Sequence, residues 1–125
     1  MIDVAGLSWK LPTHLQQKNR CNVHYVSDEE IEKLILPDDG QDCWENCAIL
    51  ISTIDNERLI PYLPRIFEWY KDLNWPGIEI IDQKVKQMSP ELIRDALKTT
   101  IQRAQNDNDT EWCENLYSSF QNILD

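Results

Sequence analysis

Cysteine and histidine are the side chains of this sequence best suited to bind a metal ion. Cys21 and His24 are separated by two residues, and Cys43 and Cys47 by three, which places the second pair on one face of a helix. Together the two pairs could supply four tetrahedral zinc ligands. Cys47 also falls on the apolar face of its predicted helix, where a free cysteine behaves as a small hydrophobic residue. We therefore expect no metal site and no cofactor.

Groups that could perform acid–base or nucleophilic catalysis lack suitable surroundings. Asp38 and Asp39 lie between a proline and a glycine. A solvated turn is expected there, not the shielded cleft in which paired carboxylates take separate pKa values. His14 and His24 accompany no recognisable nucleophile motif at a serine or cysteine. With 3 glycines the chain has no Gly-rich phosphate loop. The sequence therefore predicts a protein that is not an enzyme.

Acidic side chains dominate the charge of the chain. There are 22 acidic and 12 basic side chains, which give a net charge of −10. Residues 27–57 contain ten acids and a single base, and the five acids after Arg103 are accompanied by no base. A field of this sign repels the phosphates of nucleic acids and attracts basic proteins. We expect a basic protein partner and no direct nucleic-acid contact. The alternative is that the acids only keep a small protein soluble.

Tryptophan is frequent, at 5 residues in 125, and it is favoured at protein interfaces. Trp44 falls on an apolar helix face and is predicted to lie in the core. Trp69 lies off the face that Phe67 and Tyr70 define, so core and partner contact are both open for it. Trp75 lies in a turn, where filling the gap between neighbouring helix pairs is favoured over partner contact.

The predicted partner contacts combine acids near helix ends with one of these tryptophans. We assign them to Asp38, Asp39, Asp42, Glu45, Trp69, Asp72, Asp107, Asp109 and Glu111.

The elements that must position these residues are helices. Ser27 and Glu30 form a capping-box pattern, and similar helix starts are predicted at Asp42 and Asn108. Apolar residues at helical spacing predict helices over about 27–36, 42–54, 57–72, 78–88, 90–105 and 109–124. Residues 1–26 show no clear period and are predicted to form a lead-in segment that packs on the helices. Within it, polar and apolar residues alternate over 22–26, which predicts a short strand or an extended arm.

A weak internal repeat indicates how these helices are arranged. The stretch Glu57–Ile60 resembles Pro90–Ile93, 33 residues later. One helix pair per unit of this length is typical of α-solenoids. We expect an all-α fold, a short right-handed HEAT-like α-solenoid of about six antiparallel helices. It would form a single domain over residues 1–125, with repeats in 27–125; an irregular bundle remains the alternative.

Residues 60–76 carry a more specific signal, the run IPYLP followed by W-x-x-D-x-N-W-P over Trp69–Pro76. In this stretch the chain resembles an uncharacterised bacterial domain family with HEAT-like helical repeats. The resemblance covers about residues 35–124 and includes the segments Leu36–Asp39 and Asp107–Trp112, whereas Lys84 and Lys86 depart from it. It implies a HEAT-like helical fold and no assigned chemistry.

The expected location follows from two further patterns. No stretch approaches the ~20 apolar residues of a membrane span. Residues 1–10 lack the basic start and apolar run of a secretory signal. We expect a cytoplasmic protein with reduced thiols.

Small size, strong acidity and the lack of catalytic groups favour an immunity protein. It would bind and neutralise a basic nuclease toxin of a bacterial competition system, such as contact-dependent inhibition. The alternative is a helical-repeat scaffold or adaptor that binds a host protein or peptide.

Overall fold

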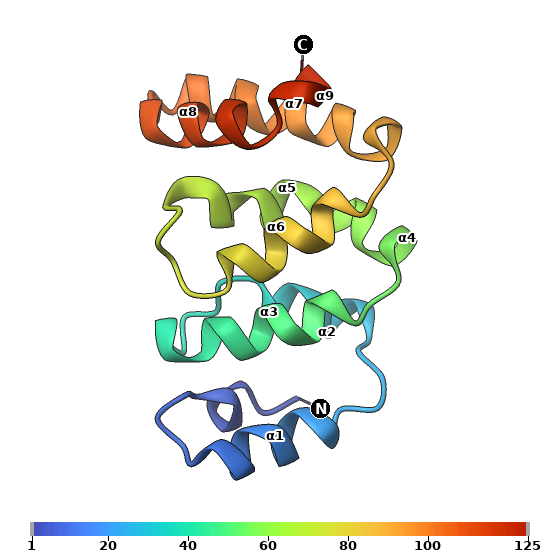
Figure 1. The fold of residues 1–125 in the computed structure, drawn as a ribbon, viewed down its shortest axis with the longest axis vertical. Helices are drawn as coiled ribbons and strands as arrows, with labels where there is room; N and C mark the ends of the chain where they lie inside the picture. Colours follow the sequence, from blue (N-terminus) through green and yellow to red (C-terminus); the bar gives the residue numbers. More distant parts are fainter. Residues whose placement is uncertain (1, 125) are drawn as a thin grey trace.

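The computed structural model describes residues 2–124, which form helices and turns without a strand in that range. Figure 1 shows the helices side by side in pairs, and the pairs are stacked along the long axis of the molecule. The N-terminal pair lies at one end of the stack and the C-terminal helices at the other. The prediction of an all-α fold is therefore confirmed.

Each pair joins two runs of helix by a turn, and some runs are interrupted by short 3-10 helices (η). The N-terminal pair is η1 (Val4–Leu7) and α1 (Thr13–Cys21); the second pair is α2 (Asp28–Leu34), η2 (Gln41–Cys43) and α3 (Trp44–Ser52). The third pair is α4 (Asn56–Leu59), η3 (Ile60–Tyr62), α5 (Leu63–Ile66), η4 (Phe67–Lys71) and α6 (Ile78–Lys86). The last is α7 (Pro90–Asn106), α8 (Thr110–Ser119) and α9 (Gln121–Leu124).

One helix start follows its predicted capping pattern, and another begins with a proline. The Ser27 hydroxyl accepts a hydrogen bond from the backbone N–H of Glu30 (3.3 Å), and the Glu30 carboxylate accepts one from the Ser27 N–H (3.1 Å). This capping box starts α2. Pro90 starts α7 in the first helical position, where its missing N–H costs little.

The capping pattern predicted at Asp42 is not formed. α3 begins later, at Trp44, after the 3-10 turn of η2. The carboxylate of Asp42 accepts a hydrogen bond from the Ser8 hydroxyl and so faces the N-terminal pair. A contact between elements distant in sequence has taken the place of the local cap.

At the start of α8 the cap lies one residue later than predicted. Asp109 caps the helix, and its Oδ1 accepts a hydrogen bond from the backbone N–H of Trp112 (3.1 Å). Asn108 instead takes a left-handed conformation (φ 56°) in the turn before it, which asparagine tolerates better than most residues.

The third predicted helix, over residues 57–72, is divided into α4, η3, α5 and η4. Pro61 and Pro64 lie within it, and each removes a backbone N–H from the helical ladder.

Residues 1–26, predicted as a lead-in without helical period, contain η1 and α1. Residues 23–27 form neither a helix nor a strand and connect α1 to α2, so the short strand is not formed.

Aromatic side chains fill the core where the third pair meets the last. The largest fully buried side chains are Trp69, Trp112, Tyr70, Phe67 and Phe120. The indole N–H of Trp112 donates to the Phe67 carbonyl (3.0 Å). The ring of Phe120 packs edge-on against Phe67, with centroids 5.6 Å apart. Neighbouring pairs are therefore joined by a continuous apolar core, as stacked helix pairs require.

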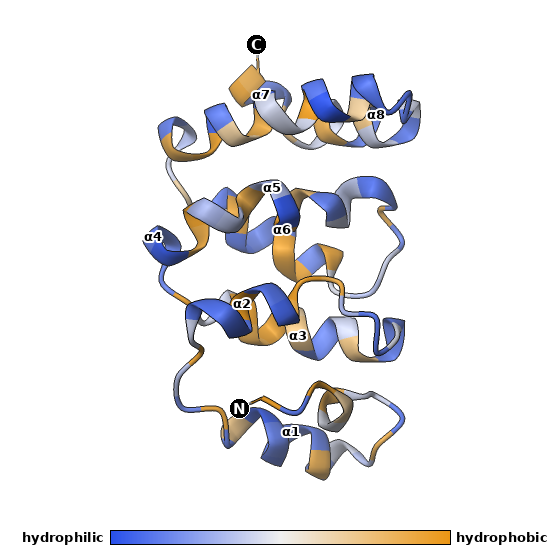
Figure 2. Cartoon of the chain, turned by 180° about the vertical axis from the view of Figure 1, so that it is seen from behind, coloured by the Kyte–Doolittle hydropathy of each residue, from blue (hydrophilic) through white to orange (hydrophobic). Residues whose placement is uncertain are grey.

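The two edges of the stack differ in the turns they contain. The turns within the pairs (residues 8–12, 35–43, 72–77 and 107–109) all lie at one edge, on the left in Figure 1, and we call this the turn edge. The connections between pairs lie at the opposite edge. Figure 2 shows that the helix ends at the turn edge are largely hydrophilic. Among residues 2–124 no helix has both the length and the apolar character needed to cross a bilayer.

Candidate partner-binding surface

The acids predicted to contact a partner are brought together on the turn edge, although they are distant in sequence. Asp38, Asp39, Asp42 and Glu45 lie in or just after the turn between α2 and α3; Asp72 follows η4; Asp107, Asp109 and Glu111 surround the start of α8. Because the turns are stacked, the segments that carry these acids share one edge of the molecule (Figure 1).

Most of these acids are open to solvent and to a partner. The exposed ones are Asp38, Asp39, Glu45, Asp107 and Glu111. None of the five accepts a side-chain hydrogen bond or forms an ion pair within residues 2–124. Their charges are therefore available for recognition.

The other three acids are half-buried and hold the turns in shape. Asp42 accepts a hydrogen bond from the Ser8 hydroxyl, which holds the pKa of Asp42 below its ordinary value despite partial desolvation. Asp72 accepts the backbone N–H of Asn74 (2.8 Å), and Asp109 caps α8. Their first role is to position the edge.

Acids also occur at the opposite edge, so the charge is not confined to one side. Asp28 and Glu29 begin α2, and Asp55 and Glu57 surround the start of α4. The guanidinium of Arg58 pairs with Asp28 (3.1 Å) and therefore offsets part of this charge.

The assignment of Trp69 to the partner surface is wrong. Its side chain is 0% exposed, and its indole N–H donates to the Pro76 carbonyl (2.8 Å). The reason is the position of η4, which α5, α6 and α8 contact from several sides. A helical segment that is covered on several sides buries side chains all around its axis. The periodicity of one helix predicts only a single buried face, so it could not predict the burial of Trp69.

Trp44 and Trp75 pack against each other between the second and third pairs. Their rings meet edge-on, with centroids 5.2 Å apart. Both are half-buried, and the indole of Trp44 donates to the Pro37 carbonyl (2.9 Å). Trp75 therefore fills the gap between neighbouring pairs, as its position in a turn predicted.

Trp9 is an exposed aromatic residue beside the acids that the sequence did not single out. Its side chain is 45% exposed. Its backbone is fixed, because its N–H donates to the Asp42 carbonyl (2.9 Å) and its own carbonyl accepts from the Gln16 side chain (3.0 Å). The sequence did not predict the exposure of Trp9 because residues 1–26 show no clear periodicity. Its polar neighbours Ser8 and Lys10 were the only local indication that Trp9 is exposed.

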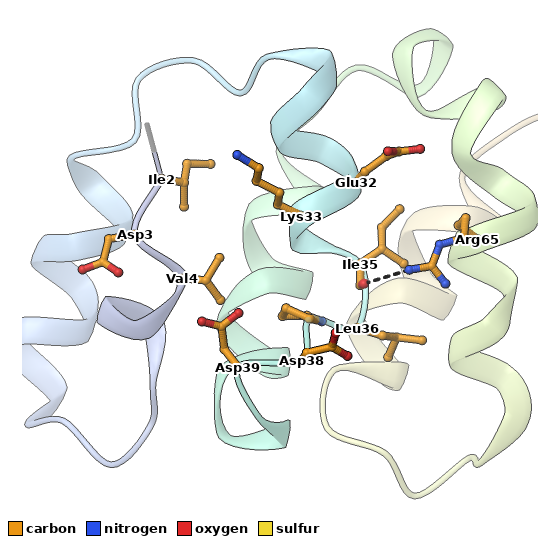
Figure 3. A pocket seen from close by; sticks show the side chains of 11 residues that line it. Ile2, Asp3, Val4, Glu32, Lys33, Ile35, Leu36, Asp38, Asp39 and Arg65 are labelled. Carbon is orange, nitrogen blue, oxygen red and sulfur yellow. Dashed lines mark hydrogen bonds between the residues drawn. The ribbon is translucent and has the colours of Figure 1, made fainter.

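A groove opens beside the turn between α2 and α3 (Figure 3). It has a volume of about 500 Å³ and lies between the N-terminal segment, α2 and α5. Its lining combines apolar side chains with carboxylates and two cationic groups, namely Ile2, Asp3, Val4, Glu32, Lys33, Ile35, Leu36, Pro37, Asp38, Asp39 and Arg65. Two of the predicted contacts, Asp38 and Asp39, therefore border a depression rather than a flat surface.

The candidate zinc ligands are not brought together. Cys21 is exposed at the end of α1, whereas Cys43 and Cys47 are buried. Burial raises the pKa of Cys43 to about 11 and that of Cys47 to about 12, so both remain thiols at neutral pH, not thiolate ligands. Among residues 2–124 there is no group of three or more His, Cys, Asp or Glu side chains suited to a metal ion.

Comparison with known proteins gives one match. No curated protein and no solved structure matches the chain. A family model described as a domain of unknown function, DUF5071, matches residues 35–124. This range agrees with the extent of the resemblance seen in the sequence, and it leaves η1, α1 and α2 outside. The chain therefore belongs to the DUF5071 family.

Proposed function

We propose that this protein is an immunity protein that binds and neutralises a basic nuclease toxin of a bacterial competition system. One observation carries the proposal: exposed, unpaired carboxylates from separate turns share one edge of a stacked helical scaffold. We further propose that the stack is a short right-handed HEAT-like solenoid and that binding takes place in the cytoplasm, where a nuclease toxin finds its substrate.

Electrostatic complementarity is the physical reason for this choice of partner. A nuclease must hold phosphates, so its active-site surface is basic. An acidic edge is complementary to that surface, accelerates association and suppresses wrong partners. The turns are held by hydrogen bonds such as those of Asp72 and Asp109, so little conformational entropy is lost on binding.

The state of the cysteines also supports binding over catalysis. The raised pKa values of Cys43 and Cys47 keep both thiols protonated, and a protonated, buried thiol is a poor nucleophile. His14 and His24, the only histidines of the chain, are both exposed, without the shielded surroundings that tune a general base.

A matched pair of variants tests the proposal. The test variant neutralises the five exposed acids of the turn edge: Asp38→Asn, Asp39→Asn, Glu45→Gln, Asp107→Asn and Glu111→Gln. The control neutralises five exposed acids elsewhere on the chain: Glu29→Gln, Asp55→Asn, Glu57→Gln, Glu91→Gln and Asp95→Asn. Both variants change the net charge by the same amount, so only the position of the charge differs.

The proposal expects a nuclease toxin domain to be encoded beside this gene, and that domain is the probe. We expect the native protein to bind it and to rescue cells that express it. The turn-edge variant should associate about tenfold or more slowly at low salt, and the control variant nearly as fast as the native protein. Equal slowing in both variants would reject the turn edge as the interface. Failure of the native protein to bind the toxin domain, together with capture of a housekeeping protein, would favour the adaptor.

A further inference from the structure

One face of α8 points away from the third pair and remains open. On the covered side of this helix, the indole N–H of Trp112 donates to the Phe67 carbonyl (3.0 Å). The Asn115 amide donates to the Tyr70 carbonyl (2.8 Å) on the same side. The opposite side has a depression of about 430 Å³, lined by Thr110, Cys113, Glu114, Tyr117, Ser118 and Gln121. These residues recur at helical spacing and form one continuous surface, which we call the α8 face.

α1 presents an open face at the other end of the stack. The side chain of Gln16 accepts a hydrogen bond from the Asn46 amide of α3 (3.0 Å), and Arg20 donates to the same Asn46 side chain. His14, Lys18 and Cys21 lie on the opposite side of α1 and are exposed. We call these three residues the α1 face, and it points away from the second pair.

The row of second helices indicates what fits on the α8 face. α1, α3, α6 and α8 each follow the turn of their pair, so all four begin at the turn edge (Figure 1). Within the row α1 contacts α3, and α3 contacts α6. Among residues 2–124 no further helix pair lies beyond α7 and α8. An α1 helix from another copy of the chain would continue this row in the same direction.

The two open faces belong to segments of opposite charge. Residues 4–21 contain three basic side chains and no acid, whereas residues 104–124 contain four acids and no base. Lys18 and Glu114 are exposed at the middle of their faces, and neither forms an ion pair within residues 2–124. α7 contains charges of both signs, so the complementarity is specific to α8.

We propose that the α8 face binds the α1 face of a second copy of this chain, in a head-to-tail contact that continues the stack. The ammonium of Lys18 pairs with the Glu114 carboxylate, and its aliphatic stem packs against the ring of Tyr117, which is 47% exposed. Because the contact joins two different faces, it does not close, and further copies add in a row. The inference is independent of the proposed function, since both faces belong to this chain.

The net charge of −10 on each copy opposes the contact at long range. At physiological ionic strength, charges more than about 8 Å apart are largely screened, whereas a Lys18–Glu114 pair in contact is screened less. We therefore expect weak, reversible association at physiological salt. Association should decrease at low salt, because the repulsion between the copies is then no longer screened.

Charge reversal in the full chain tests the pairing, with sedimentation velocity measured over a range of protein concentrations. Lys18→Glu and Glu114→Lys should each weaken self-association about tenfold, because each replaces an attractive pair by a repulsive one. The double variant Lys18→Glu/Glu114→Lys restores the pair in reverse and should associate within about threefold of the native protein. Glu29→Lys, at an exposed acid of α2, changes the net charge as Glu114→Lys does and should not weaken association.

Cysteine cross-linking tests which faces meet. Cys21 is exposed on the α1 face and Cys113 is half-buried on the α8 face, whereas Cys43 and Cys47 are buried. A bismaleimide with an arm of about 10 Å, comparable to the distance between packed helix axes, should join Cys21 of one copy to Cys113 of the next. The cross-linked products should disappear in Cys21→Ser and equally in Cys113→Ser.

Three results would contradict the proposal. A molar mass equal to that of one chain at every concentration would exclude the contact. Cross-linked dimers that persist in Cys113→Ser would show that α1 meets α1, so the α8 face is not the partner surface. A double variant that associates as weakly as the single variants would exclude the pairing of Lys18 with Glu114.

Discussion

At the scale of single residues, a buried indole N–H group holds the turn of the third pair against η4. Trp69 donates to the Pro76 carbonyl and is 0% exposed. In Trp69→Phe the ring is smaller and the Pro76 carbonyl loses its donor. We expect the free energy of unfolding to fall by about 2–4 kcal/mol, measured by urea denaturation. An unchanged free energy would mean that Trp69 does not serve the core.

In contrast to the buried Trp69, Trp9 is an exposed tryptophan, and its backbone is hydrogen-bonded to that of Asp42. Trp9→Ala should leave the free energy of unfolding within about 0.5 kcal/mol of the native value. Loss of an aromatic anchor should accelerate dissociation of the toxin domain by about tenfold or more. Surface plasmon resonance measures this rate. A dissociation rate equal to that of the native protein would exclude Trp9 from the interface.

Asp42 makes stability depend on pH in a predictable direction. Its pKa in the folded protein lies below the ordinary value because the Ser8 hydroxyl donates to its carboxylate. The stabilisation is therefore complete above the ordinary pKa and is lost as the pH falls through the lowered pKa. Asp42→Asn should melt at a lower temperature than the native protein at pH 7, and the difference should shrink toward pH 3. Asp39→Asn, at an exposed carboxylate, is the control and should not alter the melting temperature at pH 7.

At the scale of elements, local chemistry predicted the start of α2, whereas the cap expected at Asp42 is not formed and the cap of α8 lies one residue later than expected. The capping box of Ser27 and the Ser89–Pro90 start act within one turn of backbone, so the sequence contains all the information needed. The stacking of the turns, and with it the grouping of the acids, followed from short connections between helices.

Contacts between elements decided the features that the sequence did not predict. α1 has no buried residue among Thr13–Cys21, so it lacks the apolar period that reveals a helix. Asp42 does not cap its own helix. Its carboxylate accepts a hydrogen bond from Ser8 instead, because the N-terminal pair lies against it. Trp69 became buried because η4 is covered by helices of its own pair and of the last pair. Each of these depends on a neighbour distant in the chain.

The turn before α6 depends on one glycine. Gly77 has φ 88°, and a Cβ atom there would lie 2.8 Å from the Cβ of Ala48 and 3.0 Å from the Trp44 carbonyl oxygen. Gly77→Ala therefore combines a left-handed alanine with overpacking against α3. We expect a loss of about 2–4 kcal/mol in the free energy of unfolding, measured by urea denaturation. A loss below about 1 kcal/mol would show that α3 and α6 can move apart at little cost.

At the scale of the whole molecule, the N-terminal pair is attached differently from the others. η1 and α1 contribute only Leu7 to the buried apolar core, and they also depend on Asn46 of α3, which is 3% exposed. The amide of Asn46 donates to the Leu7 carbonyl (2.6 Å) and to the Gln16 side chain (3.0 Å), and it accepts from Arg20. The family region begins beyond this pair, at residue 35. Residues 2–21 therefore lie outside the matched region and are held to it in part by the hydrogen bonds of the buried Asn46 side chain.

Asn46→Ala tests this view of the molecule. The substitution removes both donors and the acceptor, so the Leu7 carbonyl and the Arg20 guanidinium lose buried partners. We expect the free energy of unfolding to fall by about 2–3 kcal/mol. Hydrogen exchange should accelerate first in the amides of α1, while those of α7 and α8 keep their protection, because a local opening exposes only the segment that detaches. Uniform acceleration along the chain would mean that the N-terminal pair unfolds only together with the rest. In that case the groove wall formed by Ile2 and Val4 would be as rigid as the stack itself, and not a separately attached part of the molecule.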